Sequence, residues 1–174
     1  MNRKEKIRQL DLDLAQHKGL LSEEEEQRYI DLVVECYEVP EAEEGETEEP
    51  LPLELLKLHK KLQLMIRDSS TEVNGFVMGG QVRWIPPYKR ANFRCAIDSM
   101  RTNGKPVVEI DGIVLPIEMA SAALVDIEDY AADCDTITKH HAAAIEALET
   151  AEAVAAYDFT TGYPQMLNFD KQEE

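Results

Sequence analysis

The longest regular pattern of apolar and polar positions in this chain runs from residue 118 to residue 148. Apolar side chains recur there at alternating steps of three and four residues, the spacing of one face of an α-helix. These positions are Ala120, Leu124, Ile127, Tyr130, Ala131, Cys134, Ile137, His141, Ala144, Ile145 and Leu148. The pattern predicts one uninterrupted helix of about 45 Å. Because a compact domain of this size usually needs a shorter helix, part of the stripe should face another helix or another copy of the chain.

Two shorter amphipathic patterns predict a helical hairpin over residues 1–37. Gly19 suits the end of the first helix, and Ser22 with Glu25 has the spacing of a capping box at the start of the second. The positions expected to face a core are Ile7, Leu10 and Leu14 in the first helix and Tyr29, Ile30, Val33, Val34 and Tyr37 in the second. Such a hairpin is too small to bury its apolar stripe alone. We therefore expect an arm that docks on the rest of the chain or on a partner.

Residues 38–52 form an acidic segment that separates this arm from the remainder. Six of the nine residues from Glu41 to Glu49 are glutamate. Like-charge repulsion and the lack of apolar side chains predict a flexible linker, with an acidic arm that mimics DNA as the alternative. The domain boundary is placed here, and residues 53–174 are expected to form one α+β domain.

Between this linker and the long helix, the sequence predicts two more helices and two β-hairpins. A helix over 53–67 is followed by strands 73–78 and 81–85 around Gly79-Gly80, a helix over 88–102, and strands 106–110 and 113–117 around Asp111-Gly112. Asp-Gly is preferred in a type I′ turn. That register places Val108, Ile110, Ile113 and Leu115 on one face. The expected fold is a mainly helical α+β protein with two small hairpins packed on a long helix.

The C-terminal part predicts a short helix over 151–156 and an aromatic tail that folds back. Its residues Tyr157, Asp158, Thr161, Gly162, Tyr163 and Pro164 follow a hairpin with a tryptophan, a helix and a second hairpin. This arrangement, within Gly75 to Phe169 at most, resembles a domain of unknown function found in bacteriophage and prophage tail-associated proteins. The family brings no catalytic residues to carry over. The resemblance implies a virion component or an assembly factor of a tailed phage, located in the virion or in the host cytoplasm.

The net charge of −17 is unevenly distributed along the chain. Residues 1–56 carry a net charge of −11, residues 57–105 carry +7, and residues 106–174 carry −13. A basic middle between acidic ends is self-complementary, either within one fold or between copies. No apolar run is long enough for a membrane span, and the N-terminus lacks the apolar core of a signal peptide. We expect no membrane association and no secretion.

Residue types that could support catalysis or metal binding are present but poorly placed. His140 and His141 would point about 100° apart on a helix, so one ion could not take both from that element. The three cysteines, Cys36, Cys95 and Cys134, are isolated on apolar stretches, and buried free thiols are expected. Gly79-Gly80 lacks the lysine of a phosphate loop. The sequence therefore predicts no enzyme, no metal and no cofactor.

The basic middle block offers a candidate binding surface. The predicted partner-binding residues are Lys89, Arg90, Arg94, Trp84 and Tyr88. Trp84, the only tryptophan, is also expected to anchor the core from its strand. Because the overall negative field opposes approach to DNA, a protein partner is favoured over nucleic acid. The expected function is a virion structural protein of the tail, baseplate or fibre attachment, binding other phage proteins or itself. The alternative is a protein outside the virion, an assembly chaperone or an acidic DNA-mimic inhibitor of host defence.

Overall fold

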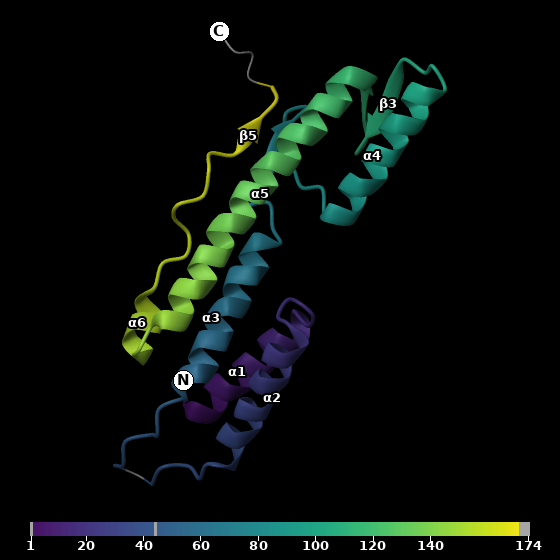
Figure 1. Cartoon of the computed structure of the whole chain (residues 1–174). Coiled ribbons are helices and arrows are strands. Elements are labelled where there is room, and N and C mark those ends of the chain that lie inside the picture. The colour runs from purple at the N-terminus through teal and green to yellow at the C-terminus, as the bar shows by residue number, and fades with distance from the viewer. Residues whose placement is uncertain (1, 44, 171–174) are drawn as a thin grey trace. The chain divides into compact units, whose positions relative to one another are not determined.

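The computed structural model describes residues 2–43 and 45–170, and it confirms the predicted mainly helical α+β class (Figure 1). The helices are α1 (Arg3–Gln16), α2 (Glu23–Glu38), α3 (Leu53–Asp68), α4 (Pro87–Thr102), α5 (Ile117–Ala147) and α6 (Ala151–Ala156). The strands are β1 (Phe76–Met78), β2 (Gln81–Arg83), β3 (Val107–Ile110), β4 (Ile113–Pro116) and β5 (Leu167–Asn168). The long helix and both hairpins lie where the sequence predicts them.

The chain divides into two compact units, each built from two separate stretches. Unit 1 consists of Met1–Arg67 and Thr138–Thr161, and unit 2 consists of Asp68–Ile137 and Gly162–Glu174. Helix α5 therefore contributes to both units. The sequence placed a single boundary in residues 38–52, whereas the structure groups α3 with the N-terminal hairpin because they share one core.

The core of unit 1 forms where α3 meets the hairpin of α1 and α2. Its buried residues include Ile7, Leu10 and Leu14 of α1, as predicted, and Leu55, Leu58 and Leu62 of α3. Tyr29 of α2 is completely buried, and its hydroxyl donates a hydrogen bond of 3.1 Å to the carbonyl oxygen of Leu10. The predicted capping box of Ser22 and Glu25 is confirmed. The hairpin thus docks on α3.

Helix α2 buries a different set of residues from the set that the sequence predicts. The buried positions are Tyr29, Leu32, Val33 and Cys36, whereas Ile30, Val34 and Tyr37 are exposed. Both sets have helical spacing, so the apolar pattern does not decide between them. The structure selects the first set because α1 and α3 pack against that side. The prediction that Ile30, Val34 and Tyr37 face the core is wrong.

Oppositely charged side chains meet within unit 1. Lys61 Nζ lies 3.1 Å from Glu25 Oε1 and 2.6 Å from Glu146 Oε2. In the acidic segment, Glu41 pairs with Lys4 at 2.6 Å, and the backbone N–H of Arg3 donates to Glu48 Oε1 at 3.3 Å. Charge complementarity between the sequence blocks is therefore realised in part inside one chain. The flexibility of segment 38–52 stays a prediction.

In unit 2, both predicted hairpins are confirmed with their turns. Gly79 and Gly80 both have positive φ, and so do Asp111 and Gly112, as a type I′ turn requires. In the second hairpin Val108 pairs with Leu115 and Ile110 with Ile113. All four side chains belong to the core cluster or pack against it, together with Ala120, Leu124 and Ile127 of α5.

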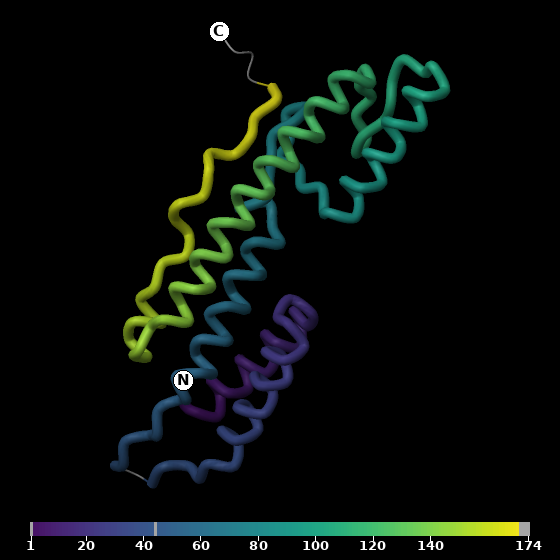
Figure 2. Tube along the Cα trace, viewed as in Figure 1, coloured from purple at the N-terminus to yellow at the C-terminus, as the bar shows by residue number. Residues whose placement is uncertain are grey.

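The C-terminal tail returns to unit 2 and adds a strand that the sequence does not reveal. Figure 2 shows the tail running beside α5 towards β1. Strand β5 pairs in parallel with β1, with Phe76 opposite Leu167. The backbone N–H of Phe169 donates to the carbonyl oxygen of Val77 at 2.9 Å, and its ring packs edge-on against Phe76. The predicted fold-back is confirmed.

Asp170 fixes this tail to the turn between β1 and β2. Its carboxylate accepts hydrogen bonds from the backbone N–H groups of Gly79, at 2.8 Å, and Gly80, at 2.7 Å. Hydrogen bonds to an ionised acceptor are stronger than neutral ones. Through this one side chain, the tail is tied to the turn between β1 and β2 in the sheet whose strand order is β2-β1-β5.

The packing of unit 1 predicts that Leu62→Ala lowers the free energy of unfolding by about 2–5 kcal/mol, because the substitution leaves a cavity at a completely buried position. Urea denaturation followed by circular dichroism measures this change. The matched control is Leu12→Ala on α1, where the side chain is 45% exposed and the change should stay within about 0.5 kcal/mol. Equal effects of the two substitutions would contradict the assigned core.

The contact of Asp170 predicts that Asp170→Ala loosens the tail. Loss of two charge-assisted hydrogen bonds should lower the free energy of local opening by on the order of 1–3 kcal/mol. Amide hydrogen exchange at Phe169, whose N–H bonds to β1, should become faster accordingly. Glu109→Ala, an exposed carboxylate on β3, serves as the control and should leave this exchange rate unchanged.

Candidate functional site

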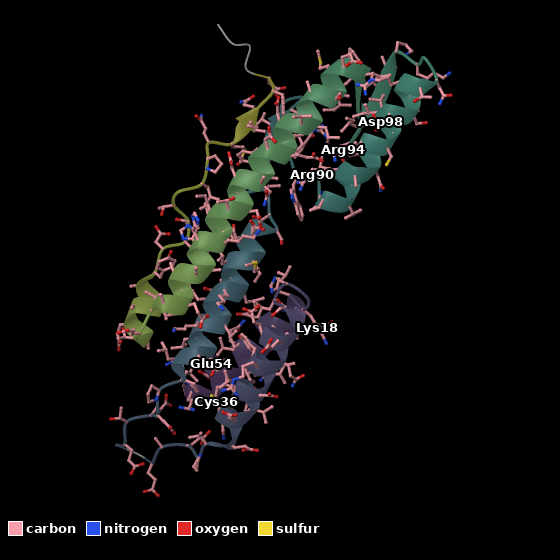
Figure 3. The ribbon with its side chains drawn as sticks, viewed as in Figure 1. Lys18, Cys36, Glu54, Arg90, Arg94 and Asp98 are labelled. Atoms are coloured by element: carbon pink, nitrogen blue, oxygen red, sulfur yellow. The ribbon has the colours of Figure 1, made fainter. Side chains whose placement is uncertain are left out.

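Two consecutive prolines set the start of α4, the helix that carries most of the candidate residues. Pro86 is the N-cap, in an extended conformation, and Pro87 is the first helical residue. Proline fits that position because its fixed φ suits the first turn and its missing N–H would have no helical partner. Figure 3 labels Arg90, Arg94 and Asp98 along α4. The register of α4, and so the side on which each arginine lies, begins at this proline pair.

Unit 2 contains a hollow of about 540 Å³ beside α4. Trp84, Pro87 and three alanines form its apolar lining, and Arg90, Arg94, Asn74 and Glu128 are among its polar residues. The alanines are Ala91 of α4 and Ala131 and Ala132 of α5. Their short side chains leave room for an inserted side chain of a partner.

Trp84 lines this hollow and does not anchor the core. Strand β2 ends at Arg83, and the indole of Trp84 is only half-buried. Ile85, which is 2% exposed, takes the core position instead. Neighbouring residues of an extended segment point to opposite sides, so burial of Ile85 turns Trp84 outwards. The prediction that Trp84 anchors the core is wrong.

Arg90 and Arg94 differ in how their charges are balanced. Arg94 forms an ion pair with Glu128 of α5. Arg90 is half-buried and donates from Nη1 to the carbonyl oxygen of Ile85 at 3.2 Å, and no carboxylate pairs with it among residues 2–43 and 45–170. Burial lowers the pKa of the Arg90 guanidinium, which nevertheless stays protonated near neutral pH. Arg90 therefore has no ion-pair partner among the described residues, although it shares the lining of the hollow with Trp84 and with the carboxylates of Asp68, Glu128 and Asp135.

The structure brings together three of the five predicted partner-binding residues. Trp84, Arg90 and Arg94 line the hollow, whereas Tyr88 and Lys89 do not. Tyr88 is 66% exposed, and Lys89 is also exposed. Residues 88 and 89 precede Arg90 by one or two positions, so they point to other sides of the helix. The predicted basic surface thus consists of three residues that line the hollow and two exposed residues that lie next to it.

Other members of the basic block pair with acidic residues of the same unit. Arg83 Nη1 lies 3.2 Å from Asp111 Oδ2. Arg101 Nε lies 3.2 Å from Glu118 Oε1. These arginines are therefore less available to an outside partner than their number in the sequence suggests.

Of the two adjacent histidines of α5, His141 holds the segment that follows α6. His140 is exposed, and His141 is half-buried. His141 Nδ1 lies 2.8 Å from Tyr157 Oη, and Nε2 lies 2.9 Å from the carbonyl oxygen of Thr161. Because a carbonyl only accepts, Nε2 carries a proton there. The described part of the chain contains no group of three or more His, Cys, Asp or Glu residues arranged for a metal ion.

Several residues of the C-terminal resemblance shape the tail. Tyr157 and Thr161 hold His141, as described above. Asp158 Oδ1 accepts hydrogen bonds from the backbone N–H and the hydroxyl of Thr160, which lowers the pKa of its carboxyl group. Gly162 has a φ of +85°, a region that favours glycine. This part of the motif builds a turn.

The cysteines divide into two buried thiols and one exposed thiol. Burial raises the pKa of Cys36 and of Cys134, which favours the unreactive thiol form. Cys95 lies on the outer side of α4 and is exposed, so the prediction that all three are buried is wrong for this residue.

Comparison with family models, with curated proteins and with solved structures finds no match to this chain. Among the residues that the structure describes, no helix has both the length and the apolar composition required to cross a lipid bilayer.

The half-buried indole predicts that Trp84 reports on the hollow by fluorescence. Acrylamide should quench the native protein less strongly than the urea-unfolded protein, because part of the ring is covered. Quenching should nevertheless be clearly measurable, because the rest of the ring faces the hollow. Stern–Volmer analysis of both states makes the comparison, and a native protein that acrylamide does not quench would contradict the open hollow.

Proposed function

We propose that this chain is a bacteriophage virion-associated structural protein, a component of the tail, the baseplate or the fibre attachment, and that it acts by binding other proteins. The phage setting is supported by the resemblance of the segment from Tyr157 to Pro164. The binding role is carried by one observation, the hollow in which Trp84 lies with Arg90 and Arg94. The proposal includes that the chain is not an enzyme.

The composition of the hollow suits a protein partner. Tryptophan and arginine are enriched among the residues that contribute most to protein–protein binding, because they combine a large contact area with hydrogen bonding. Arg90 has no carboxylate partner within the described residues, so an aspartate or glutamate of a partner can pair with it. An apolar side chain beside that carboxylate would fit between Trp84 and the alanines of α4 and α5.

Nucleic acid fits the same hollow less well. Asp68, Glu128 and Asp135 belong to its lining, so the repeated phosphates of a nucleic acid strand would meet more repulsion there than a single carboxylate that pairs with Arg90. The net charge of −17 opposes approach to DNA over a longer range. The sequence alternatives outside the virion, an assembly chaperone or a DNA-mimic inhibitor, share the binding role but predict absence from purified particles.

Particle composition tests this proposal directly. The gene is deleted from the phage or prophage, full-length variants are supplied from a plasmid, and copies per purified particle are counted by quantitative mass spectrometry. We expect wild-type protein at a fixed stoichiometry. Trp84→Ala and Arg90→Ala should each reduce incorporation about tenfold or more, since such anchor residues typically contribute at least about 1–2 kcal/mol.

Tyr88→Ala and Lys89→Ala are the matched controls, because these residues neighbour the hollow without lining it. Their incorporation should equal that of the wild type. A loss for all four variants would indicate the wider basic surface that the sequence predicts. Expression during infection together with absence from purified particles would contradict a virion protein and favour the chaperone or inhibitor alternative.

A further inference from the structure

Helix α2 carries a second apolar stripe that its own unit does not cover. Ile30, Val34 and Tyr37 are 37%, 51% and 44% exposed. Their spacing of four and three residues places them on one side of the helix, over about 10 Å of its length. The adjacent side of α2, about 100° away around the helix axis, already faces the core of unit 1 through Tyr29 and Leu32. Helix α2 thus has a second apolar side, which the packing of unit 1 leaves exposed.

Acidic side chains frame this stripe. At 100° per residue, Glu23, Asp31 and Glu38 lie within about 100° of Ile30 around the helix axis. All three are exposed and form no ion pair closer than 4.0 Å within residues 2–43 and 45–170, although the charge of Asp31 acts on Arg28 of the same helix. Asp31 accepts a hydrogen bond only from the amide of Gln27, at 2.9 Å. Arg28, the one basic residue of α2, pairs with Glu54 of α3 and with Glu35.

The charge of the chain argues against a second copy as the molecule that covers this stripe. The sequence of unit 1 contains 11 basic and 21 acidic residues, and that of unit 2 contains 7 basic and 14 acidic residues. Several of the basic residues are already paired within their own unit, among them Lys61 and Arg94. Apart from the small basic surface around Lys89 and Arg90, another copy would therefore bring mainly like charge to an acidic surface.

We propose that the Ile30–Val34–Tyr37 stripe of α2 is a docking surface for a basic amphipathic helix of a partner protein. Apolar side chains of that helix would pack between Ile30, Val34 and Tyr37, and its flanking lysines or arginines would pair with Glu23, Asp31 and Glu38. This is recognition by helix-on-helix packing with charge complementarity at the rim. The inference rests on the proposed function in that both require a binding protein, but it concerns a surface separate from the hollow of unit 2.

A pair of synthetic peptides tests the chemistry with the full-length protein. The first is a helical peptide of about three turns whose leucines recur at steps of three and four residues and whose flanking positions are lysines. The second has glutamates in place of the lysines. Fluorescence anisotropy of labelled peptides measures binding. The lysine peptide should bind at least tenfold more tightly than the glutamate peptide, and its affinity should fall as salt is added.

Substitutions then locate the binding. Ile30→Ala with Val34→Ala should weaken binding of the lysine peptide at least tenfold. Leu12→Ala, which removes an exposed apolar side chain from α1, should leave it unchanged. Asp31→Lys with Glu38→Lys should reverse the preference, so that the glutamate peptide binds more tightly. Circular dichroism verifies that each variant remains folded.

Three results would overturn the inference. In the first, the lysine peptide binds the Ile30→Ala, Val34→Ala variant with wild-type affinity, which would mean attraction to any acidic surface. The two peptides could bind equally to the wild type. Light scattering could show a wild-type dimer that this double substitution abolishes, which would make a second copy the occupant. None of these results affects incorporation of the Trp84 or Arg90 variants into particles, so the two proposals fail independently.

Discussion

The apolar stripe of α5 must be covered along its whole length, and the fold of both units reflects that requirement. In unit 2 its side chains Ala120, Leu124 and Ile127 form part of the core with the two hairpins and α4. Further along, Tyr130 and Cys134 pack with Val73, and the Tyr130 hydroxyl donates to the Val73 carbonyl oxygen at 2.8 Å. Within unit 1, Ile145 of the same helix is completely buried. A proline inside this helix would break it and disturb a surface on which both units depend.

Features that depend on a few neighbouring residues could be predicted from the sequence. Features that depend on contacts between distant segments could not. The capping box at Ser22, the prolines before α4 and the Asp111-Gly112 turn act over a few residues, so their effects can be deduced from the sequence. The buried side of α2 could not be deduced, because two apolar stripes compete on one helix. Strand β5 has only two residues and no alternating pattern.

The candidate site shows the same division. Arg90 and Arg94 could be predicted as a pair because they lie one turn apart on a helix. Their different environments could not, because Arg94 meets Glu128 only once α4 packs beside α5. The sequence predicts a core position for Trp84 because tryptophan is usually buried on average. Its actual position depends on whether residue 84 or residue 85 points inwards, which the next proline and the packing of the hairpin decide.

The interleaving of the two units has a consequence for folding during synthesis. Unit 2 needs β5 beside β1, yet about 90 residues separate Phe76 from Leu167 along the chain. At about 5–20 residues per second, a ribosome takes roughly 5–18 seconds to cover that distance. During this time the edge of β1 that later receives β5 has no strand to pair with, and the N–H groups of Gly79 and Gly80 lack the carboxylate of Asp170. The nascent protein therefore passes through an interval in which an unpaired strand edge is open to other chains, and the arrival of its own tail ends that exposure.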